Sequence, residues 1–134
     1  MEQKFNEATP QRKQDHLLDA ALVSINIAAF TDQLKQEQPW KESDRNSITV
    51  FKTDGMRIVL IGLHAGAEMA KHRAGGHISV QVLEGQIKFT TDDKSLELSK
   101  GQMLALHPGI SHSVLAVQET IFLLTLATTS AGKQ

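Results

Sequence analysis

From Ser47 onward, short runs of valine, isoleucine and leucine alternate with turns made of polar residues and glycine. Asp54-Gly55, which separates two such runs, is among the strongest short-range signals for a β-hairpin. No long segment of helical periodicity separates the runs, which disfavours a parallel α/β sheet. The pattern therefore predicts an antiparallel β-sandwich or barrel. The expected strands are residues 48–53, 56–64, 78–84, 86–91, 95–98, 101–106, 112–117 and 120–127.

The chain before Ser47 has a different pattern. Residues 1–16 are polar, and Thr9-Pro10 could begin a short helix. Apolar and polar residues then alternate, which predicts a strand over 21–27.

Residues 28–37 carry apolar side chains at helical spacing, and Pro39 is expected to stop that helix. The segment 38–46 is predicted to be a surface loop whose Trp40 packs against the β domain.

These patterns predict one domain with two appendages. Residues 1–46 form an N-terminal extension, a strand plus a short helix, that packs on the β domain or on a partner. Residues 47–128 form the β domain, and residues 129–134 form a small polar tail.

Composition narrows the classes of function. In 134 residues there are 14 Lys and Arg against 15 Asp and Glu, and aromatic residues make up 4%. Such a chain has neither the excess positive charge nor the stacking side chains of a typical nucleic-acid binder or membrane-surface protein. No apolar segment is long enough for a membrane span, and a cytoplasmic location is expected.

Histidine is the side chain through which this sequence is most able to bind a ligand. The chain has six histidines and no cysteine, so thiolate chemistry is excluded. Glycine-punctuated segments at 66–85 and 101–112 carry four of the histidines, near the ends of predicted strands. A neutral imidazole there is a ready ligand for a divalent metal ion. The four are His72, His77, His107 and His112.

The two segments resemble the two motifs of the cupin superfamily. In the first motif, Gly66, His72 and Gly85 match, but the second histidine position holds Ala74 and the glutamate position holds Ile78.

In the second motif, Gly101, Gly109 and His112 match, but the proline position holds His107 and the asparagine position holds Ala116. The resemblance implies an all-β antiparallel jelly-roll barrel of the cupin type, with the short N-terminal helix outside it.

The resemblance also implies a metal site with four ligands, of which only His72 and His112 are present in register. His77 could replace a missing ligand, although strand parity turns it away from the position of Ile78. His107 has the parity of Met103 and Ala105 and could reach the pocket wall. A bound ion would be a divalent metal such as Zn, Fe, Mn or Ni.

Two functions remain open at this stage. One is a cupin-fold protein that binds a small polar or anionic molecule, with or without a weakly held divalent metal. Its pocket would be lined by the two motif histidines and by Met69, Ala74 and Ile78. The alternative is a metal-dependent cupin enzyme, a dioxygenase or an isomerase.

The remaining expectations concern partners and the other histidines. A homodimer is predicted, because an ordered N-terminal arm could cover an open sheet edge of the partner. His64 is expected at the barrel rim or an interface, and His16 in solvent.

Overall fold

The computed structural model describes residues 18–128. Within that range the chain forms two α-helices followed by nine strands. The helices are α1 (Ile27–Gln36) and α2 (Gln38–Glu42). The strands are β1 (Arg45–Lys52), β2 (Met56–Leu63), β3 (Glu68–His72), β4 (His77–Glu84), β5 (Gln86–Thr91), β6 (Ser95–Ser99), β7 (Met103–Leu106), β8 (His112–Ala116) and β9 (Thr120–Ala127).

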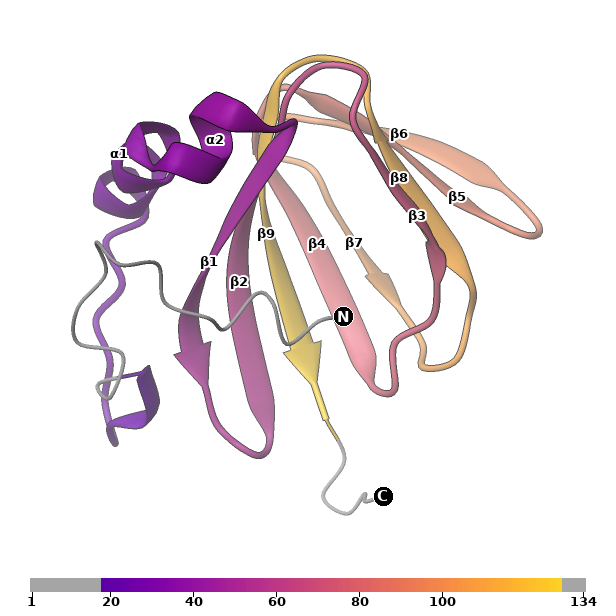
Figure 1. The fold of residues 1–134 in the computed structure, drawn as a ribbon. Coiled ribbons are helices and arrows are strands. Elements are labelled where there is room, and N and C mark those ends of the chain that lie inside the picture. The colour runs from indigo at the N-terminus through magenta and orange to yellow at the C-terminus, as the bar shows by residue number, and fades with distance from the viewer. Residues whose placement is uncertain (1–17, 129–134) are drawn as a thin grey trace.

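The strands form two antiparallel sheets that face each other (Figure 1). The larger sheet has the order β1-β2-β9-β4-β7, and the smaller sheet has the order β3-β8-β5-β6. Strands far apart in sequence are neighbours, as β2 and β9 are, which is typical of a jelly roll. The predicted antiparallel all-β architecture is confirmed.

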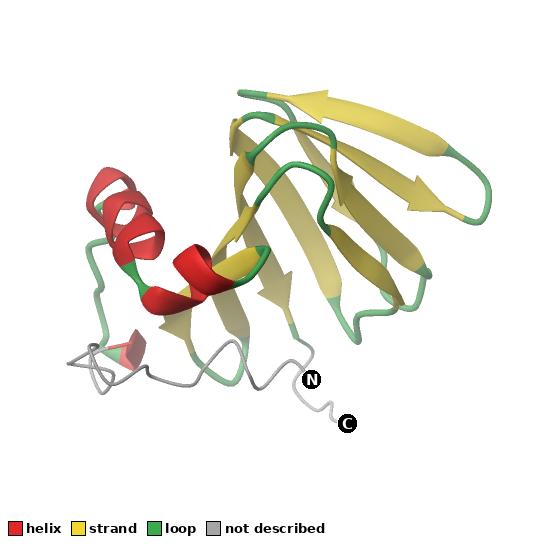
Figure 2. Cartoon of the chain, turned by 45° about the horizontal axis from the view of Figure 1, so that its top comes forward, coloured by secondary structure: helices red, strands yellow, loops and turns green. Residues whose placement is uncertain are grey.

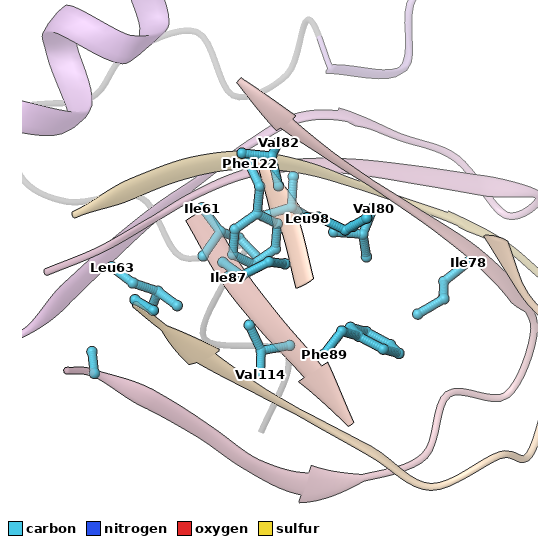
Figure 3. Packing of buried hydrophobic residues seen from close by; sticks show 13 residues of the cluster. Ile61, Leu63, Ile78, Val80, Val82, Ile87, Phe89, Leu98, Val114 and Phe122 are labelled. Atoms are coloured by element: carbon cyan, nitrogen blue, oxygen red, sulfur yellow. The ribbon is translucent and has the colours of Figure 1, made fainter. Parts of the chain in front are cut away.

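One hydrophobic core lies between the sheets (Figure 3). Ile78, Val80 and Val82 project from alternate positions of β4 and are at most 5% exposed, as the two-residue period of a strand requires. Phe122 of β9 and Phe89 of β5 fill the space between the sheets. The same parity places Val59, Ile61 and Leu63 of β2 in this core.

A second core lies on the outer face of the larger sheet, under the two helices (Figure 2). Leu34 of α1 and Trp40 of α2 pack there against Leu60 of β2 and Ile121 of β9. Gly62 permits the close approach, because a methyl group at this position would lie 2.7 Å from Cδ2 of Leu34. Strand β2 is therefore buried on both faces, which explains its continuous apolar sequence.

All eight predicted strands are confirmed to within about three residues at their ends. Strand β3 is missing from the prediction because it is short and polar: it contains Glu68 and Lys71 and pairs only with β8, through an irregular register.

Two predictions for the N-terminal part are wrong: the strand over 21–27 and the loop over 38–46. No strand lies between residues 21 and 27, since β1 is the first strand of the described part of the chain. Asn26 instead caps α1: its side-chain oxygen accepts a hydrogen bond from the backbone N–H of Ala29 at 3.0 Å.

The predicted loop over 38–46 contains α2 and the start of β1. Pro39 ends the first helix but occupies the first turn of the second, where its missing N–H costs nothing. Trp40 is 7% exposed and packs on the sheet, as expected.

No helix within residues 18–128 is long and apolar enough to cross a membrane. The helix predicted near Thr9, and His16, lie outside the described residues.

Candidate binding cavity

A cavity of about 540 Å³ opens between the two sheets, a volume typical of small-molecule sites. Its apolar wall combines residues of both sheets: Val59, Met69, Ile78, Leu124 and Leu126. Ala74, from the loop between β3 and β4, also lines it. The lining also includes two imidazoles and four cationic side chains: His72, His112, Arg45, Arg57, Lys71 and Arg73.

His72 and His112 lie side by side in this cavity. They are register partners on β3 and β8, and their ring centroids are 4.4 Å apart with the planes tilted by 59°. His112 is 3% exposed and stacks on Phe89, with centroids 5.2 Å apart. His72 is exposed to solvent. The pair therefore presents one fixed, buried imidazole and one accessible imidazole to a ligand.

Backbone carbonyls fix the tautomer of both rings. Nδ1 of His72 lies 2.8 Å from the carbonyl oxygen of Ala70, and Nδ1 of His112 lies 2.9 Å from that of Ile110. A carbonyl oxygen can only accept, so each Nδ1 carries a proton and donates it. In the neutral ring Nε2 then keeps its lone pair, free to accept a hydrogen bond or to bind a metal ion.

Burial lowers the pKa of His112 below its ordinary value of 6.5. The hydrogen bond to the Ile110 carbonyl acts in the opposite direction, and the charge of His72 adds a smaller lowering. His112 is therefore neutral at pH 7.

Three of the four cationic side chains have a hydrogen-bond or ion-pair partner: Arg45, Lys71 and Arg73. Arg45 Nε donates to Asp44 at 2.9 Å, and a second guanidinium nitrogen donates to the carbonyl oxygen of Glu68. The hydrogen bond from Arg45 holds the pKa of Asp44 below its usual range. Lys71 pairs with an oxygen of Asp92 at 2.8 Å.

Arg73 has a neutral partner, the hydroxyl of Ser111 at 3.1 Å. Arg57 differs from the other three cations because it makes no hydrogen bond or ion pair with any residue from 18 to 128. It is half-buried on β2 and shares the parity of Val59, Ile61 and Leu63, whose side chains form the core. Its guanidinium group thus belongs to an inward-facing row that is otherwise apolar.

Sequence reasoning missed Arg57. Its inward orientation could have been inferred from that of Val59, since residue 57 is two positions before Val59 and side chains two residues apart in a strand lie on the same face. The inward face of β2 could not be recognised from the sequence, because β2 is buried on both faces and its inward and outward positions are equally apolar.

The donor set of the cavity does not match a three- or four-ligand metal site. Within the described range, no group of three or more histidine, aspartate or glutamate side chains is placed to hold an ion. No carboxylate is among the described residues that line the cavity, whereas four cationic side chains are. A divalent cation there would gain two imidazole ligands and would be repelled by the surrounding charge.

The other two candidate ligands lie elsewhere. His77 and His107 pair with each other, with ring centroids 5.1 Å apart, and neither lines the cavity. His64, which follows β2, stacks on Trp40 and does not line the cavity.

Comparison with known proteins supports the architecture. No family sequence model and no curated protein sequence matches this chain. Among solved structures, a cupin superfamily protein from Desulfitobacterium hafniense superposes with a TM-score of 0.62 at 18% identity, over 63% of this chain and 78% of that one. A protein of unknown function from Streptococcus pyogenes gives a TM-score of 0.63 at 24% identity, over 83% and 90%.

Salicylate 1,2-dioxygenase from Pseudoaminobacter salicylatoxidans gives a TM-score of 0.64 at 21% identity, over 74% of this chain and 32% of that one. What these proteins share with the chain is the arrangement of the strands. The chain is a small cupin-fold domain.

Proposed function

We propose that this protein binds a small organic anion, most simply a carboxylate on an apolar body, in the cavity between the sheets. The observation that carries the proposal is Arg57, which faces the cavity without an ion-pair partner among the described residues. A half-buried guanidinium is a strong binder of carboxylates, because it donates two parallel hydrogen bonds to the two oxygens.

The rest of the lining suits the same ligand. Arg73 adds a second positive charge that forms no ion pair within residues 18–128, whereas Asp44 and Asp92 largely offset the charges of Arg45 and Lys71. The excess positive charge raises the local concentration of anions. Leu124, Leu126 and the other apolar wall residues would take the body of the ligand. The Nε2 atoms of His72 and His112 would accept hydrogen bonds from a hydroxyl group on it.

A second function, a metal-dependent enzyme such as a dioxygenase or an isomerase, is favoured by the histidine pair. A metal ion lies about 2.0–2.1 Å from each imidazole nitrogen that binds it, and each nitrogen lies about 1.1 Å from the centroid of its ring. When the two ligands are at right angles at the metal, the two centroids are therefore about 4.5 Å apart. The observed 4.4 Å between His72 and His112 agrees with that arrangement. We place this function second, because a catalytic site commonly has three protein ligands and the described residues supply two.

The proposal is tested by titrating untagged protein with benzoate and, separately, with its neutral counterpart benzamide, using calorimetry or amide NMR shifts. We expect benzoate to bind more tightly than benzamide. Arg57→Gln should weaken benzoate binding by about ten-fold or more, which corresponds to about 1.4 kcal/mol or more for a charged hydrogen bond, and should leave benzamide unchanged.

Arg57→Lys keeps the charge, loses the forked geometry and should fall between the two. The matched control is Lys88→Gln, which removes one positive charge from an exposed position of β5 outside the cavity. Equal affinities for benzoate and benzamide, or equal losses in Arg57→Gln and Lys88→Gln, would overturn the proposal.

Elemental analysis separates the two functions. Stoichiometric metal that is lost in both His72→Ala and His112→Ala would favour the enzyme, whereas metal-free protein that binds benzoate would favour the binding protein.

A further inference from the structure

We propose that His77 and His107 form a separate site for Zn²⁺ and similar first-row divalent ions, on the outer face of the larger sheet. This site is independent of the anion-binding function, since neither residue lines the cavity.

Strand register brings the two histidines together. β4 and β7 are neighbours in the larger sheet (Figure 1). They are antiparallel, and Ile78 pairs with Leu106. His77 precedes Ile78 and His107 follows Leu106, so the two histidines face each other across the strand pair. Ile78 and Leu106 point into the core, and the alternation of side chains therefore puts both imidazoles on the opposite, outer face.

The separation of the rings matches chelation of one ion. With metal–nitrogen bonds of about 2.0–2.1 Å and nitrogens about 1.1 Å from the ring centroid, two imidazoles at a tetrahedral angle have centroids about 5 Å apart. The centroids of His77 and His107 are 5.1 Å apart, and the rings are tilted by 57° rather than stacked face to face. Strand pairing thus fixes the backbone positions of the two histidines close enough for both rings to reach one ion, which lowers the entropic cost of binding.

The surroundings of this pair contrast with those of the cavity pair. The residues on either side of both histidines are uncharged: Gly76, Ile78, Leu106 and Pro108. Ala127, which is opposite His77 on β9, is uncharged as well. His72 and His112 share their cavity with Arg57 and Arg73, which form no ion pair within residues 18–128, and with the ion-paired Arg45 and Lys71. A dication therefore meets less repulsion at the outer pair, whereas an anion is favoured inside.

The ligand type limits the class of ion. Neutral imidazole suits Zn²⁺, Ni²⁺ and Cu²⁺, whereas Mg²⁺ and Ca²⁺ prefer oxygen ligands. Both rings are exposed, so water can complete the coordination and the ion should exchange readily.

The test is calorimetric titration of untagged, metal-stripped protein with Zn²⁺, with Mg²⁺ as the control ion, and parallel NMR observation of the imidazole resonances. We expect one Zn²⁺ per chain, no binding of Mg²⁺, and shifts of the His77 and His107 resonances. Either His77→Gln or His107→Gln should weaken Zn²⁺ binding by about ten-fold or more, because each removes one of two ligands.

The comparison variant is His72→Gln, which removes one ring of the cavity pair and should leave unchanged the Zn²⁺ affinity measured from the His77 and His107 resonances. Affinity that survives both His77→Gln and His107→Gln would overturn the proposal. So would affinity that is lost in His72→Gln, since the ion would then lie in the cavity, and so would the absence of Zn²⁺ binding at millimolar concentration.

Discussion

The indole of Trp40 lies face to face with the imidazole of His64, with ring centroids 3.6 Å apart and planes 24° from parallel. Nε2 of His64 also donates a hydrogen bond to the backbone carbonyl of Trp40 at 2.9 Å. Nδ1 of the same ring lies 3.3 Å from a carboxylate oxygen of Glu119. Because Trp40 belongs to α2 and His64 follows β2, this stack fastens the helix pair to the larger sheet.

Trp40→Ala should therefore destabilise the whole domain. The indole is 7% exposed and contributes to the core beneath the helices, and its loss should lower the free energy of unfolding by about 3–5 kcal/mol. Urea denaturation followed by circular dichroism measures this, with Leu22→Ala, at a site 89% exposed, as the control expected to change little. Equal effects of the two substitutions would show that the helix pair adds nothing to domain stability.

Gly85 tests the importance of the turn between β4 and β5. Its φ is +88°, and a methyl group there would clash with the backbone carbonyl oxygen of Glu119. Gly101 is the matched comparison, because its φ is +87° but a methyl group would meet nothing within 4 Å.

Gly101→Ala should cost about 1–2 kcal/mol from the left-handed backbone alone, and Gly85→Ala should cost distinctly more. Thermal denaturation of both variants checks the order, and a similar loss in the two would contradict the clash.

His112 should make stability depend on pH. Its pKa is lowered in the folded protein by burial, so the unfolded chain binds a proton more readily than the folded one and acid favours unfolding. The penalty is absent above the unfolded pKa near 6.5, grows as the pH falls below it, and levels off once the pH passes below the folded pKa. Denaturant titrations from pH 8 to 5 should show this slope in the wild type and a smaller slope in His112→Gln. If His112→Gln has the same pH dependence of stability as the wild type, groups other than His112 cause that dependence.

Salt should weaken benzoate binding and not benzamide binding. The cations around the cavity are partly open to solvent, and raising the salt from about 0.01 M to 1 M shortens the screening length from about 30 Å to 3 Å. We expect benzoate affinity to fall several-fold over that range in a calorimetric series. Benzoate affinity that does not depend on salt would indicate that its carboxylate is not near these charges.

The strands were predictable because β-branched runs and glycine turns are local signals. Asp54-Gly55 and Gly85 mark their turns regardless of the rest of the chain. The resemblance to the cupin motifs implied that His72 and His112 share a pocket, and both line the cavity. The prediction for 21–27 was wrong because five alternating residues fit an extended chain as well as a strand, and Asn26 caps α1 instead.

Strand β3 and Arg57 depend on pairing across the fold, which no local pattern reports. The metal-ligand roles of the histidines, the homodimer and the domain boundaries stay predictions.

Strand β9 lies between β2 and β4 at the centre of the larger sheet, although it follows all the other described strands in the sequence. During translation, β2 is therefore synthesised long before its partner β9. Val59 of β2 can pair with Leu124 of β9 only after strands β3 to β8 have been synthesised. The larger sheet can form completely only after β9 has left the ribosome, so the order of the strands in the sheet differs from their order of synthesis. Such distant pairing slows folding, and the apolar β2 lacks its β9 partner, and is prone to aggregate, until β9 has left the ribosome.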